Sequence, residues 1–394
     1  MKNLETLIQE LCPDGVEFVK LGDVCEIKTG KGITQKDCSE SDKYPVYSGG
    51  KEPMGYYKEF NRNANTVTVS RVGAYAGFVN YVTEDFYLND KCFSVLPKKD
   101  EDINSKYLYY KLKALECSII NMQSGGGVPT INTKKVGSLE IPLPPIEVQT
   151  EIVRILDKFT SLEAELEAEL DCRRRQYEYY RDKLLSFENV GGQEVEWKKM
   201  SEVGTFIRGK RFVRTDIVEE GIPCIHYGDI YTYYGLTATK AKTYLKPEKA
   251  EKMKFASKND VVIVGAGENN MDIGVGVAWL SDEKVAIHDA CYIFKSKMNP
   301  RFVSHYLRGS NYHLQIKKYV CEGKICSISS KSIGRSLIPV PSLQEQERIA
   351  TILDRFESLT TSLQSGLPAE IAARRQQYEH YRDKLLTFKR KGAA

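Results

Sequence analysis

One segment of this chain occurs twice, and this duplication constrains the fold more than any other feature. Residues 141–187 recur as residues 338–388, and the copies align without gaps up to Leu162 and Leu359. The second copy then carries four extra residues, about one helical turn, so the side-chain faces stay nearly in phase. A repeat this long, nearly 200 residues from its copy, indicates two equivalent units rather than a solenoid of short repeats.

The segments that precede the two copies are faintly related as well. Residues 15–31 align with residues 194–210. The matching pairs are Val16/Val195, Glu17/Glu196, Phe18/Trp197, Val24/Val203, Gly30/Gly209 and Lys31/Lys210. Between these framework segments the halves diverge, as expected of two domains that share a scaffold but differ in what they bind.

This layout predicts an α+β fold with an internal pseudo-two-fold repeat. Two β-rich globular domains are separated by two long, antiparallel coiled-coil helices. The predicted segments are an N-terminal amphipathic helix at 1–14, a first domain at 15–141, a first helix at 142–190, a second domain at 191–338 and a second helix at 339–394.

The repeated segments have the apolar spacing of long helices. In the first copy the stripe comprises Ile152, Ile155, Leu156, Phe159, Leu162, Leu166, Leu170, Tyr177, Leu184 and Phe187. Pro142, Pro144 and Pro145 prevent an earlier start, and Gly191–Gly192 mark the exit. The second helix is expected over Ser342–Phe388, with a break or kink at Ser365–Pro368. The two stripes are expected to pack on each other; the alternative is that each packs on its own domain.

The composition is that of a globular protein, with 41% hydrophobic and 28% charged residues. The chain has no apolar run long enough for a transmembrane helix. Glu5 and Glu10 lie among the first leucines, which argues against a signal peptide. The ten cysteines lack zinc-site spacing, so we expect reduced thiols, no bound metal and a cytoplasmic location.

The variable domains have the patterns of short strands. These runs are Thr66–Ser70, Gly77–Val82, Cys92–Leu96, Val261–Val264, Val275–Leu280 and Ala290–Phe294. Helices are expected at Ser105–Cys117 and Pro300–Ser310. Residues 194–338 carry an excess of about seven positive charges, which favours nucleic acid as a partner of the second domain.

Polar, glycine-rich loops between the strands supply candidate DNA contacts. Such loops can present basic, amide, hydroxyl and aromatic side chains to phosphates and base edges. The candidates are Lys31, Ser48, Lys51, Arg71, Tyr75, Gln123, Lys210, Arg211, His226, Tyr227, Asn269, Asn270 and Lys324. The alternative is that these are ordinary surface loops.

Arginines and tyrosines gather at matching places in the two helices. The candidate partner-binding residues are Arg173, Arg174, Tyr177, Tyr180, Arg374, Arg375, Tyr378 and Tyr381. Arginine and aromatic residues are enriched in the cores of protein interfaces, which favours a partner-binding face over contact with phosphate.

No motif of a catalytic site is complete. Val261–Gly267 resembles the start of a dinucleotide-binding unit, but Asn270 replaces the third glycine and a strand pattern follows. Gly30-Lys31-Gly32 lacks the rest of a phosphate-binding loop. The chain also lacks the Asn-Pro-Pro-Tyr or Asp-Pro-Pro-Tyr tetrad of amino-methyltransferases. We therefore expect a recognition protein that is not an enzyme.

The alternation of variable domains with IPLPP…ILD.F helices that end in RRQxYExYRDKLLxF resembles the specificity subunit of Type I restriction-modification enzymes. The resemblance implies two target-recognition domains, each of which reads half of a bipartite, asymmetric site on double-stranded DNA. It also implies that the helices set the spacer and dock two modification (methyltransferase) subunits, which restriction/translocase subunits join.

The same resemblance implies that this chain binds no cofactor. S-adenosylmethionine, ATP and Mg2+ are expected on the partner subunits. Two alternatives stay open from the residues. One is a phage-defence or regulatory DNA-binding protein that acts without methyltransferase partners, and the other is a coiled-coil scaffold whose β-rich domains bind protein.

Overall fold

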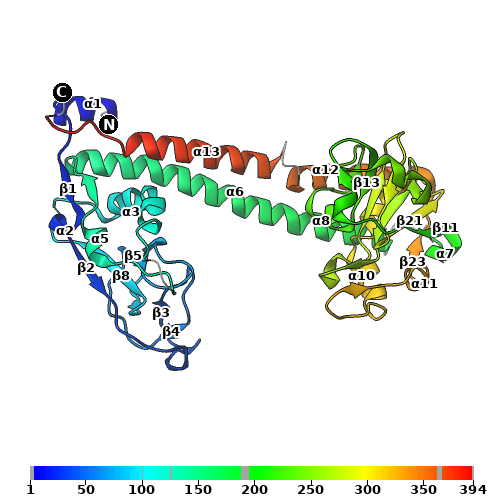
Figure 1. Ribbon diagram of the computed structural model, residues 1–394, viewed down its shortest axis with the longest axis horizontal. Coiled ribbons are helices and arrows are strands. Elements are labelled where there is room, and N and C mark those ends of the chain that lie inside the picture. Colours follow the sequence, from blue (N-terminus) through cyan, green and yellow to red (C-terminus); the bar gives the residue numbers. More distant parts are fainter. Residues whose placement is uncertain (1–3, 100, 125–126, 188–194, 362–365, 393–394) are drawn as a thin grey trace. The chain divides into compact units, whose positions relative to one another are not determined.

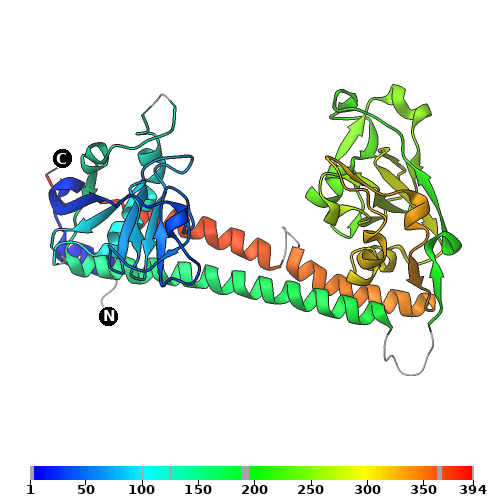
Figure 2. The same ribbon diagram turned by 90° about the horizontal axis from the view of Figure 1, so that it is seen from below.

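A computed structural model describes residues 4–99, 101–124, 127–187, 195–361 and 366–392 (Figure 1). The chain divides into two compact units. Unit 1 comprises Met1–Glu165 with Ala372–Ala394, and unit 2 comprises Leu166–Ile371. Each unit combines one β-rich domain with stretches of the repeated helices, as both views show (Figure 2).

Unit 1 is built on a four-stranded antiparallel sheet in the order β2-β8-β5-β6. Its strands are β2 (Cys25–Thr29), β8 (Cys92–Pro97), β5 (Thr66–Ser70) and β6 (Val79–Val82). A three-stranded sheet contains β4 (Tyr56–Tyr57), β3 (Tyr44–Tyr47) and β7 (Tyr87–Leu88), and a separate pair contains β1 (Phe18–Lys20) and β9 (Glu140–Pro142). All side chains of β5 are buried, and α3 packs against β5 and β6.

Short helices complete the domain of unit 1. They are α1 (Leu4–Leu11), α2 (Leu21–Val24), η1 (Gln35–Asp37), α3 (Ser105–Ala114), α4 (Glu116–Ile120) and α5 (Thr133–Gly137). Asn104 caps α3 by accepting from the N–H groups of Lys106 and Tyr107. The helix expected over Ser105–Cys117 is therefore two helices, which meet at Leu115.

Unit 2 repeats this scaffold with additions. Its first sheet contains β11 (Gly204–Arg208), β21 (Cys291–Ser296), β17 (Val261–Val264), β19 (Gly276–Trp279) and β14 (Thr237–Ala238). Its second sheet contains β12 (Ile217–Val218), β15 (Thr243–Leu245), β13 (Ile222–Ile225), β20 (Val285–Ile287) and β16 (Phe255–Ala256). Two further pairs are β10 (Trp197–Lys199) with β23 (Leu337–Pro339) and β18 (Ala266–Gly267) with β22 (Cys326–Ser327).

The helices of unit 2 also follow those of unit 1. They are α7 (Met200–Val203), η2 (Arg214–Asp216), α8 (Tyr227–Thr232), η3 (Pro247–Lys252), η4 (Asn270–Asp272), α9 (Pro300–Tyr306), α10 (Ser310–Lys317) and α11 (Ser330–Ile333). The helix expected over Pro300–Ser310 ends earlier, at Tyr306, and α10 begins at Ser310.

The pairing of the strands establishes the equivalence of the two domains. Phe18 faces Pro142 in the β1–β9 pair, and Trp197 faces Pro339 in the β10–β23 pair. The β3–β7 pair is parallel, and so is the β13–β20 pair in unit 2. The faint similarity of the framework segments thus reflects one shared scaffold, and each strand-like run of the sequence contains a strand.

The repeated segments form the long helices. The first copy is α6 (Ile146–Ser186), which begins directly after Pro145, whereas the expected exit at Gly191–Gly192 lies outside the described residues. The second copy is α12 (Leu343–Thr361) and α13 (Leu367–Leu385), so the expected break is confirmed. Gly366 adopts a φ of +83° before α13, a conformation that favours glycine. Residues 362–365 lie outside the described residues.

Part of the apolar stripe packs on its own domain, and another part packs on the second long helix. Val148, Ile152 and Leu156 are buried in the core of the unit 1 domain. Further along the same helix, Phe159 stacks on Tyr381 of α13, with 5.5 Å between ring centroids. In unit 2, Tyr180 of α6 stacks on Phe356 of α12 at 5.4 Å. These two helix-to-helix contacts are equivalent, since each joins a tyrosine of one copy to a phenylalanine of the other.

A buried glutamine attaches each domain to the start of its helix. In α6, Gln149 accepts from the Asn104 N–H at 2.8 Å and donates to the Pro144 carbonyl at 2.8 Å. In α12, Gln346 accepts from the Asn299 N–H at 2.8 Å and donates to the Pro341 carbonyl at 2.8 Å. Each amide therefore makes two hydrogen bonds, one with the backbone N–H of the N-cap residue of the domain helix and one with a carbonyl of the proline segment.

Replacing Gln346 with leucine is expected to destabilise unit 2. Gln346→Leu leaves the Asn299 N–H and the Pro341 carbonyl without partners, at about 1–3 kcal/mol for each buried group. The free energy of unfolding, measured in urea, checks this. Gln344→Leu is the matched control, because Gln344 is exposed on the same helix. Equal stability of the two variants would show that the amide contacts contribute nothing.

Candidate nucleic-acid interface

Three loops of unit 1 converge where strands of its two main sheets end. One follows β3 at Ser48–Lys51, one follows β5 at Arg71–Tyr75, and one precedes β8 at Asn89–Lys91. Together with Gly32–Asp37 they line a hollow of about 780 Å3. Arg71 lines a second hollow, of about 470 Å3, and the next residue, Val72, lines the first. The two hollows are therefore adjacent.

Close backbone contacts hold these loops together. The Cys92 thiol donates to the Ser48 carbonyl, and burial raises the pKa of this thiol to about 11, so it stays protonated as a donor. The N–H of Arg71 donates to the Lys91 carbonyl at 2.8 Å. A side chain at Gly49 would place Cβ 2.3 Å from the Val72 carbonyl oxygen, so this approach of two loops requires glycine.

The candidate residues of unit 1 lie around this cluster of loops. Lys51 extends its Nζ over the ring of the exposed Tyr75, 5.3 Å from the centroid. Arg71 donates to the Asp90 carbonyl at 3.2 Å. Gln123 donates to the Ala76 carbonyl at 2.9 Å, so its amide supports the Tyr75 loop. Lys31 is exposed beside Gly32, at the rim of the larger hollow.

The equivalent place in unit 2 is filled by rings. His226 follows β13 as Ser48 follows β3, and its centroid lies 4.3 Å from that of Tyr227 and 4.6 Å from that of His288. Phe212 packs edge-on against His288 at 4.8 Å. Lys210 and Arg211 are exposed directly before Phe212. Four of the candidates, Lys210, Arg211, His226 and Tyr227, therefore belong to one cluster, to which His288 must be added.

The charge state of the His226 ring follows from its bonds and its burial. Burial, opposed by Asp229 and Asp289, lowers the pKa of His226. Its Nδ1 accepts from the Gly228 N–H at 3.2 Å. In the neutral ring the proton is then on Nε2, which makes this nitrogen a donor.

The remaining candidates of unit 2 lie on a second pair of loops. Strands β18 and β22 join these loops, and Asn270 donates to the Glu322 carboxylate at 3.0 Å. Asn269 caps η4 by accepting from the Met271 N–H at 3.1 Å, so its oxygen is engaged. Lys324 is exposed on the second loop.

The candidate partner-binding residues separate into buried and exposed groups. Tyr177 is only 9% exposed and belongs to the core of unit 2, so it is not part of an open face. Tyr378, its counterpart in the second copy, is partly buried against the core of unit 1. Tyr180 and Tyr381 are exposed at 42% and 37%, although each stacks on a phenylalanine.

The arginines beside these tyrosines form ion pairs or hydrogen bonds. Arg173 pairs with Glu169 at 2.8 Å along α6, and Arg375 of α13 pairs with Glu163 of α6 at 2.5 Å within unit 1. Arg374 donates to Gln377 at 3.1 Å. Arg174 is exposed on α6.

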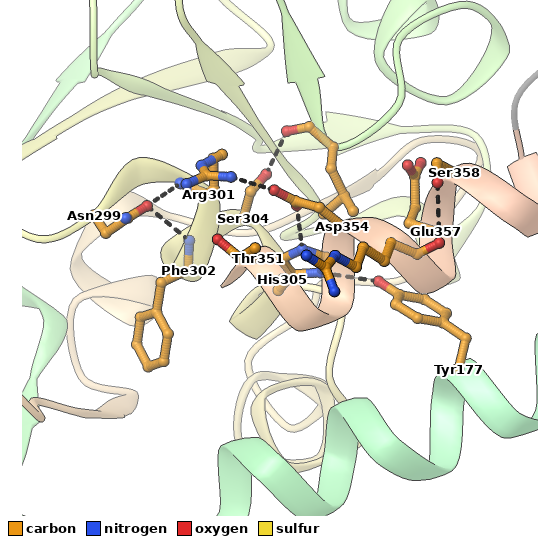
Figure 3. A network of polar contacts seen from close by, with 12 residues as sticks. Tyr177, Asn299, Arg301, Phe302, Ser304, His305, Thr351, Asp354, Glu357 and Ser358 are labelled. Atoms are coloured by element: carbon orange, nitrogen blue, oxygen red, sulfur yellow. Dashed lines mark hydrogen bonds and ion pairs between the residues drawn. The ribbon is translucent and has the colours of Figure 1, made fainter. Parts of the chain in front are cut away.

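The structure also shows a pair of equivalent carboxylates that the sequence patterns did not single out. Asp354 of α12 accepts from His305 Nε2 at 2.8 Å and pairs with Arg301, both on α9 (Figure 3). Asp157 of α6 is equivalent: it accepts from the Tyr110 hydroxyl at 2.6 Å and pairs with Lys106 at 2.8 Å, both on α3. The signal available in the sequence was an acidic residue repeated in an apolar stripe.

His305 extends this contact from α12 to α6. Burial outweighs Asp354 and lowers the pKa of His305, so the ring is neutral. It donates from Nε2 to Asp354, and its Nδ1 accepts from the Tyr177 hydroxyl at 3.1 Å (Figure 3). Burial raises the pKa of Tyr177 to about 12, which keeps the hydroxyl a donor. The burial of Tyr177 thus has a structural role, since it fastens α9 to α6.

Among the residues that the structure describes, neither a metal cluster nor a membrane helix is found. In the described part of the chain, no three His, Cys, Asp or Glu side chains converge as metal ligands would. Within the same residues, no helix is long and apolar enough to cross a membrane. Two β-rich domains on one scaffold, each with basic, amide and aromatic side chains on its loops, are typical of a modular DNA-recognition protein.

Comparison with known proteins identifies the class more closely. The family description "Type I restriction modification DNA specificity domain" matches residues 13–171 and 193–373. The Escherichia coli Type I restriction enzyme EcoR124I/EcoR124II specificity subunit is 33% identical over 417 residues, covering 98% of this chain and 97% of the relative. A putative type I specificity subunit of Haemophilus influenzae, S.HindORF215P, is 28% identical. The match covers 98% of this chain and 100% of the relative.

Solved structures agree in fold. The Type I S subunit from M. genitalium has a TM-score of 0.55 at 17% identity and covers 94% of this chain and 95% of its own. A structure from work on complex assembly and conformational transition of the type I R-M system has a TM-score of 0.58 at 18% identity. The match covers 95% of this chain and 98% of that structure's chain. The chain belongs to the Type I restriction-modification specificity subunits, and its role is DNA sequence specificity within such a complex.

The neutral, buried His305 predicts a pH dependence of stability. Because its folded pKa is lowered, the unfolded chain takes up a proton below the ordinary histidine value of about 6.5 while the folded chain does not. His305→Gln keeps a donor and an acceptor without titrating. We expect the variant to lose less stability than the parent between pH 7 and pH 5, by at most about 1.4 kcal/mol per pH unit.

Urea unfolding at the two pH values measures this difference. His380→Gln is the control, because His380 is exposed on α13, and its pH dependence should equal that of the parent. A parent-like dependence in His305→Gln would mean that His305 is not the titrating group.

Proposed function

We propose that each unit reads one half of a bipartite, asymmetric DNA site. The observation that carries this proposal is the contrast between framework and loops. Both units place their loops at the ends of the same strands, yet the position of Ser48 in unit 1 holds His226 in unit 2. A shared scaffold with different side chains at the reading positions is what two half-sites of different sequence require.

Within each unit the loop residues divide by chemistry. Lys31, Lys51 and Lys210 are exposed cations suited to phosphate contact, which contributes affinity for any sequence. Arg71, His226 and Asn270 are partly exposed groups with fixed donors, suited to base edges in the major groove. The excess of positive charge in residues 194–338 supports a stronger phosphate contribution from the second domain.

The repeated helices set the spacer between the half-sites and dock two modification subunits. One subunit per copy of the repeat accounts for the equivalent exposed residues Tyr180 and Tyr381. Methyl transfer from S-adenosylmethionine would occur on these subunits. Restriction subunits that use ATP and Mg2+ would supply translocation and cleavage, and this chain would contribute recognition without catalysis. The family match supports this reading over a regulator that acts alone or a protein-binding scaffold.

Exchange of one domain tests the proposal. Replacing residues 16–140 by the same region of a relative should change one half of the methylated motif and leave the other half and the spacer intact. The framework pair β1–β9 bounds the exchanged region, as β10–β23 bounds the domain that is left unchanged. Sequencing of methylated DNA from cells that express the complex gives the motif. A change in both halves at once would refute the assignment of one reader to each half-site.

A second experiment addresses the spacer. Within α6, Glu163–Leu166 and Glu167–Leu170 are a tandem EAEL repeat. A third copy adds about 6 Å and a net rotation of about 40°, whereas one DNA base pair adds about 3.4 Å and 35°. We expect rotation to dominate, because a rotated reading face loses its contacts whereas a few ångströms can be absorbed by DNA bending.

The insertion variant should therefore methylate the same two half-sites with a spacer one base pair longer. The same sequencing of methylated DNA measures the spacer. An active variant with the original spacer would show that α6 does not set the distance.

A further inference from the structure

Asn89 and His288 occupy the same place in the two domains. Asn89 follows β7, which pairs in parallel with β3, and His288 follows β20, which pairs in parallel with β13. The Asn89 N–H donates to the Tyr47 carbonyl at 2.9 Å, and the His288 N–H donates to the Ile225 carbonyl at 3.2 Å. Each residue then closes the same turn, since its carbonyl accepts from the N–H of a buried cysteine, Cys92 or Cys291.

Their side chains differ in chemistry but reach the same turn and the same loop. Asn89 accepts at Oδ1 from the Lys91 N–H at 3.1 Å and donates from Nδ2 to the Ile33 carbonyl at 2.8 Å. His288 accepts at Nδ1 from the Ala290 N–H, also at 3.1 Å. The His288 ring also packs against the ring of Phe212, the counterpart of Ile33, with 4.8 Å between the ring centroids. The amide of Asn89 therefore bonds both the turn and the loop, whereas the imidazole of His288 bonds the turn and contacts the loop through Phe212.

The loop that these side chains hold carries a cation of the candidate interface. Ile33 lies two residues after Lys31, and Phe212 lies two residues after Lys210. The loop is also fastened on its other side, where the Lys31 N–H donates to the Leu88 carbonyl and the Lys210 N–H to the Ile287 carbonyl, both at 2.9 Å. The bridge from Asn89 or His288 therefore fixes where the lysine backbone sits relative to the reading turn.

Burial makes the bridge rigid in both units. Asn89 is 1% exposed. The side chain of His288 is 12% exposed, and burial with the neighbouring His226, opposed by Asp289, lowers its pKa, so Nδ1 is available as an acceptor. What differs is the space around the bridge. Asn89 lines the open hollow of unit 1, whereas the larger His288 ring packs against His226 and Phe212.

We propose that Asn89 and His288 are equivalent positioning residues, which hold the Lys31 and Lys210 loops at the reading face of their own unit. The bridge is interchangeable between amide and imidazole, whereas the neighbouring side chains set which base pairs are preferred. This inference rests on the proposed assignment of one half-site to each unit.

Two substitutions at one position test the bridge. His288→Leu removes the hydrogen bond with Ala290 and the ring that packs against Phe212, whereas His288→Asn installs the side chain that serves in unit 1. The affinity of the complex with the modification subunits is measured for three DNA duplexes: the motif identified by sequencing, and the same duplex with either half-site scrambled. Discrimination is the ratio of the affinity for the intact duplex to that for a scrambled one. We expect His288→Leu to reduce discrimination against the duplex with the second half-site scrambled by about tenfold. Discrimination against the duplex with the first half-site scrambled should stay unchanged.

Rescue separates positioning from a merely structural role. His288→Asn should keep at least half of the parental discrimination at the second half-site, and Asn89→His should do the same at the first half-site. If His288→Asn fails as completely as His288→Leu, or if His288→Leu keeps full discrimination, the bridge is not the determinant. If His288→Leu were to disturb the first half-site instead, the assignment of readers to half-sites would be wrong.

Discussion

A carboxylate on each copy of the repeated helix fastens a reader domain to the helix that carries it. Asp157 binds Lys106 and Tyr110, and Asp354 binds Arg301 and His305. An ionised carboxylate that accepts two charge-assisted or hydroxyl hydrogen bonds has a strong directional preference. Since both partners lie on one turn of the domain helix, the contact fixes how that helix is rotated against the long helix. Together with the buried glutamine nearby, this contact attaches the domain to its long helix.

The domains can differ in sequence because few contacts attach each of them to its helix. The two units share the strand pairs, the capping asparagines Asn104 and Asn299, and the helix residues that meet them. The loops at the strand ends contribute little to the core, so their side chains can change without loss of the fold. Unit 2 shows the extent of this freedom, because rings fill a space that is open in unit 1. Recognition can thus be altered on a scaffold that holds its position.

Much of the secondary structure followed from local patterns. The run Thr66–Ser70 is a strand because β-branched residues fill it, and the proline segment before Ile146 fixes where α6 can start. Tyr177 shows where such reasoning stops. Its spacing and neighbours resemble an interface residue, but its hydroxyl bonds His305, a residue 128 positions away. His288 could not be predicted for the same reason, since nothing in its local sequence indicates that it lies beside His226.

The sequence by itself determined that there are two equivalent halves, that their connecting segments are helices, and that the second of these has a break or kink near Gly366. Each of these depends on periodicity, on repetition or on the restricted backbone of proline and glycine, all of which are local properties. The tertiary structure decided which polar residues of the helices hold the domains, which tyrosines are buried, and which loops meet at the candidate interface. These outcomes depend on contacts between residues far apart in the chain, and such contacts exist only once the strands have paired and the helices have packed.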